Sequence, residues 1–246
     1  AGLGQFEVNL THSEAMRAAD DTWLFKSLVR GLARKHGMAA TFMAKPFAHE
    51  AGNGMHVHFS VLNEEGNNIF DNGGADGTVM LRHAVAGCLE AMAASTLGVA
   101  PHGKIYERLV PNTYAPTVSS WAYENRTSAL RIPESHSEAR RIEHRVPGGD
   151  INPYLVLSVI LGAALAGIED EMLPPEPITG NAYDLDLPQL APTWQEAIDA
   201  FESDPLIARI LPQALIENLC LTKQQELSLL ADIDVSEHWK SYLETV

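Results

Sequence analysis

The stretch at residues 52–61 reads GNGMHVHFSV, and its residue types could do chemistry. Side chains of an extended strand alternate between two faces, so His56, His58 and Ser60 share one face and the apolar residues between them share the other. Imidazole nitrogens bind divalent cations and exchange protons near neutral pH. The same pattern is also typical of a half-buried strand with a solvated outer face, so other segments must decide between the two interpretations.

Charged residues occupy alternate positions in two other strand-like segments. Glu7 lies in QFEVNL, and the motif RRIEHRV places Arg141, Glu143 and Arg145 on one face. If these strands share a sheet with the histidine motif, carboxylates and an imidazole meet beside guanidinium groups. Such a set suits Mg²⁺ or Mn²⁺ together with phosphate or carboxylate groups, as phosphoryl transfer requires. The alternative is that the charges only form cross-strand salt bridges.

The elements that must position these residues follow from periodicity. Alternation predicts strands at residues 5–10, 41–47, 55–62, 128–133 and 140–146. Apolar residues at helical spacing predict helices at 76–97 and 153–172, and a first helix that starts from a capping box of Thr11 and Glu14 and ends at Gly37. Thr193 and Asp204 are further helix-start signals.

Together these elements predict one α+β domain over residues 1–246, with a largely antiparallel sheet. Helices pack on one face of the sheet, and its open polar face forms the active site. The Pro-rich connection at 173–192 is expected to pack over the surface rather than to link two domains.

Composition excludes several classes of function. The 246 residues carry a formal net charge of −15, which disfavours binding to nucleic acid or to an anionic membrane surface. No run of about 18 apolar residues predicts a transmembrane span, and no signal peptide is evident. Two cysteines without a CxxC motif fit a cytoplasmic location. Neither a Walker motif nor a Rossmann glycine pattern is present, so a nucleotide would bind to the sheet face itself.

Six ordered motifs carry a family resemblance: GQFEVNL, HGMAATFMAKPF, GNGMHVHFS, ERLVPNTYAP, NRTSALRIP and RRIEHRVPGGDINPYLVLSVILGAALAGI. In this order they resemble the catalytic domain of the glutamine synthetase family, densely over residues 1–170 and loosely beyond. The resemblance implies a smaller β-rich domain upstream that this chain lacks. It also implies a homo-oligomeric ring, dodecameric or decameric, with active sites between adjacent subunits, so we expect this piece alone to be inactive.

The resemblance also implies a reaction and a set of site residues. ATP phosphorylates the γ-carboxylate of glutamate, and an amine nitrogen then attacks the acyl phosphate and expels phosphate. Metal binding (Mg²⁺ or Mn²⁺) is implied for Glu7 at one position and for His56 and Glu143 at a second. Nucleotide contacts are implied for His58, Ser60, Arg126 and Arg131. Glutamate contacts are implied for Gly52, Arg108 and Arg145, and Arg126 also lies near the transferred group.

Two departures from the family pattern alter the pockets for the amine and for glutamate. Glutamine synthetases read LVPGYEAP where this chain reads LVPNTYAP, so Tyr114 stands at the catalytic position of a glutamate that deprotonates ammonium. A tyrosine, with a pKa of about 10, is a poor base for that step. Ala51 replaces an asparagine that would contact glutamate.

We therefore predict a ligase similar to γ-glutamylpolyamine synthetases, which use an organic amine. The alternatives are a glutamine synthetase that uses ammonia and a non-catalytic relative that keeps the fold for structural or binding work. The sequence leaves open which amine is the acceptor and whether glutamate is the donor.

Overall fold

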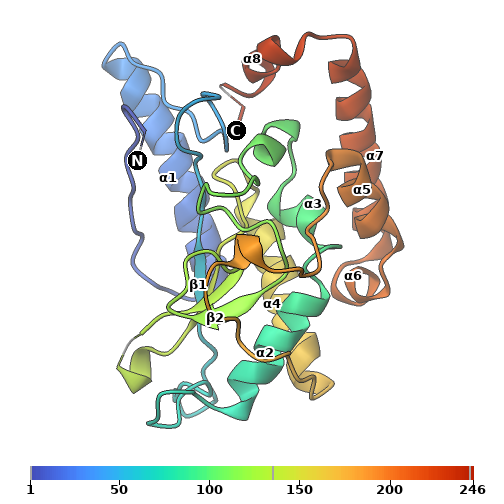
Figure 1. Ribbon diagram of the computed structural model, residues 1–246. Coiled ribbons are helices and arrows are strands. Elements are labelled where there is room, and N and C mark those ends of the chain that lie inside the picture. The colour runs from blue at the N-terminus through green and yellow to red at the C-terminus, as the bar shows by residue number, and fades with distance from the viewer. Residues whose placement is uncertain (1, 135, 244) are drawn as a thin grey trace.

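The computed structural model describes residues 2–134, 136–243 and 245–246. Its centre is a small twisted sheet of four strands in the order β1 (Val57–Phe59), β4 (Ile142–His144), β3 (Leu130–Ile132) and β2 (Trp121–Tyr123) (Figure 1). The β1–β4 and β4–β3 pairs are antiparallel, and the β3–β2 pair is parallel. The predicted α+β class and the largely antiparallel sheet are confirmed.

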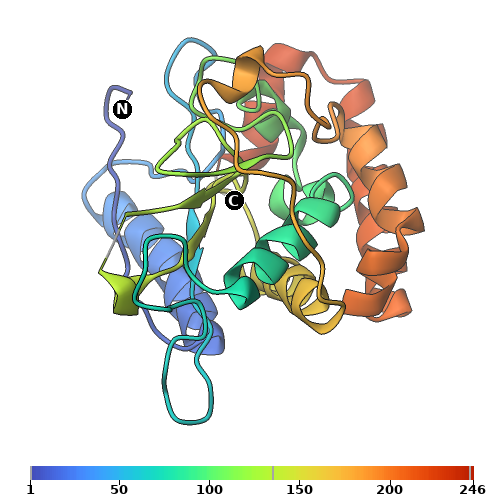
Figure 2. The same cartoon turned by 60° about the horizontal axis from the view of Figure 1, so that its bottom comes forward.

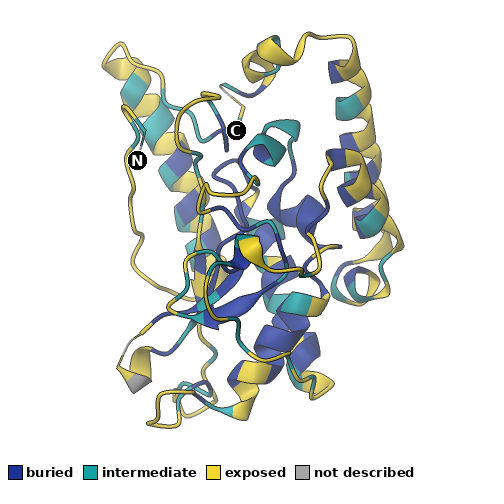
Figure 3. Ribbon diagram, viewed as in Figure 1, coloured by how far each residue is buried: buried dark blue, intermediate teal, exposed yellow. Residues whose placement is uncertain are grey.

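Three of the five predicted strands exist in shortened form, and two predictions are wrong. Residues 5–10 and 41–47 form no strand, and the segment 5–10 is mostly exposed (Figure 3). Alternation shows only that two faces differ, whereas a strand also needs a partner whose N–H and C=O groups complete the ladder. The strand β2 was not predicted, although its Trp and Tyr are residues that favour strands.

Two helices cover one face of the sheet and bury most of the core. Helices α2 (Val79–Glu90) and α4 (Pro153–Glu169) cross so closely that a Cβ on Gly87 would lie 2.0 Å from the carbonyl oxygen of Ala163. Only glycine permits this approach. The sheet contributes Val57, Phe59, Leu130, Ile132 and Ile142 to the shared core, and the helices contribute Leu81, Val85, Val156 and Ile160.

Helix α1 (Ala15–Lys35) lies on one side of the molecule, and α5 (Trp194–Ser203), α6 (Pro205–Ile210) and α7 (Gln213–Ala231) lie on the other, with the sheet between them (Figures 1 and 2). The predicted helix is confirmed, but it begins after Glu14 without a side-chain cap, so the capping box is wrong. Gly37 ends the helical turn at φ +70° as expected. The apolar residues Leu24 and Leu28 of α1 are exposed.

The C-terminal helices form a second core with the short helix α3 (Thr96–Val99). They are α5 (Trp194–Ser203), α6 (Pro205–Ile210), α7 (Gln213–Ala231) and α8 (Trp239–Tyr242). The side chains of Thr193 and Asp204 cap α5 and α6, which confirms both predicted helix starts. The predicted helix at 76–97 is interrupted by a turn between α2 and α3.

Short 3₁₀ turns complete the described structure: Gly103–Glu107, Ser137–Ala139, Ala182–Asp184 and Val235–Glu237. The connection at 173–192 runs along the β2 edge, where Ile178 donates to the carbonyl of Trp121 and Leu190 donates to that of Thr117. Its predicted packing over the surface is therefore confirmed. None of the helices in the described residues has the length and apolarity needed to cross a membrane.

Candidate active site

The strand register brings charged side chains from three strands into one row. His58 of β1 is the direct cross-strand partner of Glu143 on β4, and Glu143 is also the partner of Arg131 on β3. Directly opposed side chains lie within contact distance on one face of a sheet. The predicted meeting of the histidine motif and the RRIEHRV segment in one sheet is therefore confirmed, whereas the Glu7 segment lies outside the sheet.

Glu143 is the centre of this row and is only 2% exposed. Its Oε1 accepts from Nη1 of Arg145 at 2.5 Å and lies 3.1 Å from Nδ1 of His56. Its Oε2 accepts from Nη1 of Arg131 at 2.7 Å. His58 Nε2 lies 3.9 Å from Oε1. We call Glu143, His56, His58, Arg131 and Arg145 the acid cluster.

The acid cluster keeps its central carboxylate ionised. Burial by itself raises the pKa of Glu143, but the hydrogen bond from His56 and the charges of Arg145 and Arg131 outweigh burial and hold it well below its usual range. Burial and the charge of Arg141 lower the pKa of His58 against the opposing effect of Glu143. A carboxylate and a neutral imidazole are the forms that bind a divalent cation.

Two residues outside the predicted set hold members of the acid cluster. Nε of Arg141 donates to Nδ1 of His58 at 3.2 Å. Oε2 of Glu124 accepts from Nη2 of Arg131 at 2.7 Å. The alternation in RRIEHRV already placed Arg141 on this face, although it was not among the predicted site residues. No local pattern marks Glu124, because its contact depends on the β2–β3 pairing.

Arg108 is buried beside this row and depends on two glycines. Its Nη1 donates to the carbonyl of Val146 at 2.7 Å, and its Nη2 donates to that of Arg145 at 3.2 Å. A Cβ on Gly52 would lie 2.7 Å from Cγ of Arg108, and one on Gly54 would lie 2.5 Å from Nη2. Burial lowers the pKa of Arg108 to about 10. The two glycines therefore provide the space that this guanidinium occupies.

The loop that carries Tyr114 adjoins the acid cluster. Asn112 and Tyr114 both have left-handed backbone angles, with φ of +65° and +58°. The carbonyl of Tyr114 accepts from Nη2 of Arg145 at 3.4 Å, and that of Ala115 accepts from the hydroxyl of Tyr183 at 2.9 Å. Tyr114 is 69% exposed. Arg145 thus connects the loop backbone to Glu143.

Besides Gly52, Arg108 and Tyr114, three further predicted site residues stand outside the acid cluster. Glu7, Ser60 and Arg126 are exposed, Ser60 directly after β1 and Arg126 in the β2–β3 connection. Within the part of the chain that the structure describes, no group of three or more His, Cys, Asp or Glu side chains could hold a metal ion. The structure therefore brings His56 and Glu143 together but does not bring Glu7 to them, because its segment is not paired with the sheet.

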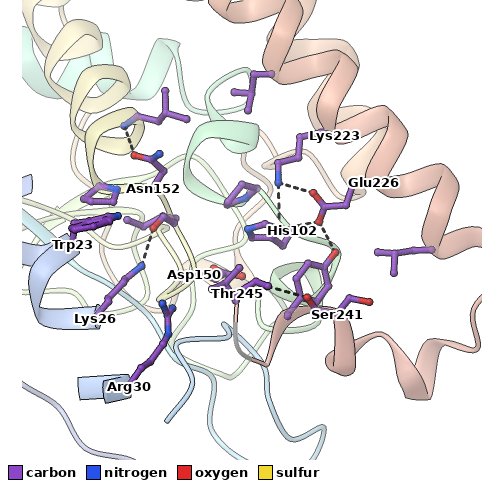
Figure 4. Close-up of a pocket in the computed structure, with 18 of the residues that line it drawn as sticks. Trp23, Lys26, Arg30, His102, Asp150, Asn152, Lys223, Glu226, Ser241 and Thr245 are labelled. Atoms are coloured by element: carbon purple, nitrogen blue, oxygen red, sulfur yellow. Dashed lines mark hydrogen bonds and ion pairs between the residues drawn. The ribbon is translucent and has the colours of Figure 1, made fainter. Parts of the chain in front are cut away.

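A cavity of about 590 Å³ lies elsewhere, between α1, the start of α4, α7 and α8 (Figure 4). Lys223 and Glu226 of α7 form an ion pair at 2.8 Å in its wall, and Glu226 also lies 3.0 Å from Nδ1 of His102. Lys26 of α1 donates to the carbonyl of Ile151 at 2.8 Å. None of the described lining residues belongs to the acid cluster, so this cavity is separate from the predicted chemistry.

The acid cluster fits a divalent cation in part. A buried carboxylate next to an imidazole supplies two ligands of suitable type, and Mg²⁺ usually completes its shell with waters and phosphate oxygens. Arg131 and Arg145 place positive charge beside them, which suits the oxygens of a phosphate or carboxylate. The arrangement can therefore hold an anionic group next to a cation.

Comparisons with known proteins agree with one another. The model of the family described as "Glutamine synthetase, catalytic domain" matches residues 1–240. The γ-glutamylputrescine synthetase PuuA of Escherichia coli is 37% identical over 228 residues, covering 92% of this chain and 48% of that protein. The γ-glutamylethanolamide synthetase of Streptomyces coelicolor is 39% identical over 203 residues, covering 82% of this chain and 43% of that protein.

A solved structure agrees with these relatives. It is described as a GmaS/ADP complex and superposes with a TM-score of 0.82 at 30% identity, covering 92% of this chain and 54% of that one. The chain spans about half the length of the curated relatives it matches.

Proposed function

Because this chain belongs to the glutamine synthetase family and matches its catalytic domain over residues 1–240, we propose that the protein is an ATP-dependent ligase that joins glutamate to an organic amine. The reaction passes through γ-glutamyl phosphate: glutamate takes the γ-phosphoryl group of ATP, and the amine nitrogen then displaces phosphate and forms the amide. The names of the amine-using relatives PuuA and the ethanolamide synthetase support this acceptor class.

The observation that carries the proposal is the buried Glu143 with its bonds to His56, Arg131 and Arg145. Burying charges costs free energy, so a buried ionised carboxylate surrounded by cations favours a catalytic role over a purely structural one. Phosphoryl transfer needs such a set, since positioning and neutralisation of charge supply most of its catalysis.

His56 and Glu143 are the proposed ligands of one Mg²⁺ or Mn²⁺, and Glu7 remains the proposed ligand of another position. The cation supplies neutralisation of phosphate charge when bound. For Glu7 to act there, its segment has to pair with the sheet, which is not its arrangement in this structure. Pairing along residues 5–10 would bring its polar face toward the open side of the sheet.

The remaining residues divide between the two substrates. His58, Ser60, Arg126 and Arg131 are the proposed nucleotide contacts, and the ADP complex of the similar structure GmaS supports a nucleotide site. Gly52, Arg108 and Arg145 are the proposed glutamate contacts. Arg126, exposed in a loop, is proposed to reach the transferred phosphoryl group.

The residue at position 114 decides our choice of acceptor. A glutamate there attracts ammonium and takes its proton, whereas the phenol of Tyr114 offers no carboxylate for either step. An organic amine with an apolar body suits this exposed phenol better than ammonium does. We also propose a cytoplasmic homo-oligomeric ring, and the two buried free cysteines Cys88 and Cys220 are consistent with a reducing compartment.

The test follows phosphate release by the full-length protein with ATP, Mg²⁺ and glutamate while the amine is varied. Putrescine, ethanolamine, a small alkylamine and ammonia are compared by kcat/KM. The proposal expects an organic amine to give the highest value and Glu143→Gln to abolish turnover. The highest value with ammonia would identify a glutamine synthetase in the ordinary sense, and no phosphate release with any of them would identify a non-catalytic relative.

A further inference from the structure

Glu124 is an exposed glutamate at the end of β2 whose two carboxylate oxygens are both engaged. Oε2 accepts from Nη2 of Arg131 at 2.7 Å, and Oε1 accepts from the backbone N–H of Glu134. Its own backbone N–H donates to the carbonyl of Ile132 at 3.1 Å. The side chain of Glu124 therefore connects the end of β2 to the backbone that follows β3 and to the guanidinium of Arg131 on β3.

The backbone of Glu124 is in an unusual conformation. Its φ is +52°, a left-handed value that non-glycine residues rarely adopt. A residue persists in that region where its surroundings determine it, and such positions occur preferentially at functional sites. The left-handed angle at the strand end coincides with the contacts that the side chain makes to Arg131 and to Glu134.

Arg131 lies between two carboxylates of different exposure. Its Nη1 donates to Glu143 and its Nη2 donates to Glu124, both at 2.7 Å. The Glu143 side chain is 2% exposed and lies inside the acid cluster, whereas the Glu124 side chain is 46% exposed and lies outside it. Glu124 therefore holds Arg131 from outside the cluster, on the end of the guanidinium that does not contact Glu143.

We propose that Glu124 is a positioning residue, which holds the guanidinium of Arg131 in the orientation that the nucleotide phosphates need. This inference rests on the proposed function. Without Glu124, Nη2 of Arg131 loses its partner, and the guanidinium is held only through Nη1 by Oε2 of Glu143 and can turn toward that carboxylate. That rotation would withdraw the guanidinium from the nucleotide.

The test uses the full-length protein with Glu124→Gln, Glu124→Asp and the control Glu134→Gln. Glu134 is a nearby exposed glutamate that contacts Glu124 only through its backbone, which the substitution retains. We measure KM for ATP, KM for glutamate, kcat and thermal stability, and we measure Kd for Mg²⁺–ADP by calorimetry.

Glu124→Gln should raise both KM for ATP and Kd for Mg²⁺–ADP roughly fivefold, the size of a partly exposed ion pair. KM for glutamate and the melting temperature should equal those of the control, and Glu124→Asp should restore part of the affinity. The inference is overturned if Glu124→Gln binds Mg²⁺–ADP like Glu134→Gln, or if both KM values rise together.

Failure of the proposed function gives a different result. A full-length protein that binds Mg²⁺–ADP but releases no phosphate with any amine refutes the ligase, while the ADP titration of the variants still decides the role of Glu124. A full-length protein that does not bind Mg²⁺–ADP refutes both.

Discussion

Replacing Glu143 by glutamine removes the one negative charge at the centre of the acid cluster. Three positive or potentially positive groups then lose their shared partner: Arg145 at 2.5 Å, Arg131 at 2.7 Å and His56 at 3.1 Å. Arg131 keeps Glu124 as a partner, and solvent compensates His56, whose side chain is 34% exposed. Arg145 is buried, and among the described residues its side chain keeps a long bond, 3.4 Å, to the carbonyl of Tyr114.

The magnitude follows mainly from Arg145. Removing one partner of a buried ion pair costs about 3–5 kcal/mol. Glutamine retains one oxygen that can accept a hydrogen bond, so we expect Glu143→Gln to lower the free energy of unfolding by about 2 kcal/mol and Glu143→Ala by about 3 kcal/mol. Both decreases are a large fraction of a typical free energy of unfolding, which is about 5–15 kcal/mol.

The assay is urea unfolding of the full-length protein without nucleotide and with a chelator present, so that no metal compensates the charge. Glu138→Gln, at an exposed glutamate, is the control. Because folding lowers the pKa of Glu143 below its ordinary value of 4.5, its contribution is fully present above that pH and declines as the pH falls below it. The difference between wild type and Glu143→Gln should therefore be constant from neutral pH down to about 5.5 and shrink below about 4.5. A difference under about 0.5 kcal/mol at neutral pH, or one that grows on acidification, would refute the reasoning.

Three other predictions concern packing, acceptor choice and pH. Gly54→Ala should destabilise the protein by about 1–3 kcal/mol in thermal unfolding, because its Cβ would lie 2.5 Å from Nη2 of Arg108. The control Gly31→Ala, in helix α1 with open space around it, should instead stabilise by about 0.5–1 kcal/mol, and a loss of stability there would contradict this account. Tyr114→Glu should shift the kcat/KM ratio toward ammonia by about tenfold, and an unchanged ratio would show that this position does not select the acceptor. Burial lowers the pKa of Lys26 from 10.5 to about 8, so the unfolded chain binds more protons between these values, and wild type should gain stability over Lys26→Met as pH rises through them in urea titrations.

The sequence by itself determined much of the local structure, because caps and side-chain alternation are properties of neighbouring residues. The starts of α5 and α6 followed from Thr193 and Asp204, and the polar face of β4 followed from alternation around Glu143. The ordered motifs further indicated the family, which the match over residues 1–240 confirms.

Tertiary structure alone decided which of these faces meet. Alternation was equally clear at 5–10 and at 140–146, yet only the second segment pairs with neighbours in this structure. A ladder is completed by residues far away in the chain, so local pattern cannot reveal whether the partner is in place. For the same reason the sequence did not predict the hydrogen bond between Glu124 and Arg131. That contact forms only because β2 pairs with β3, which brings the two residues together.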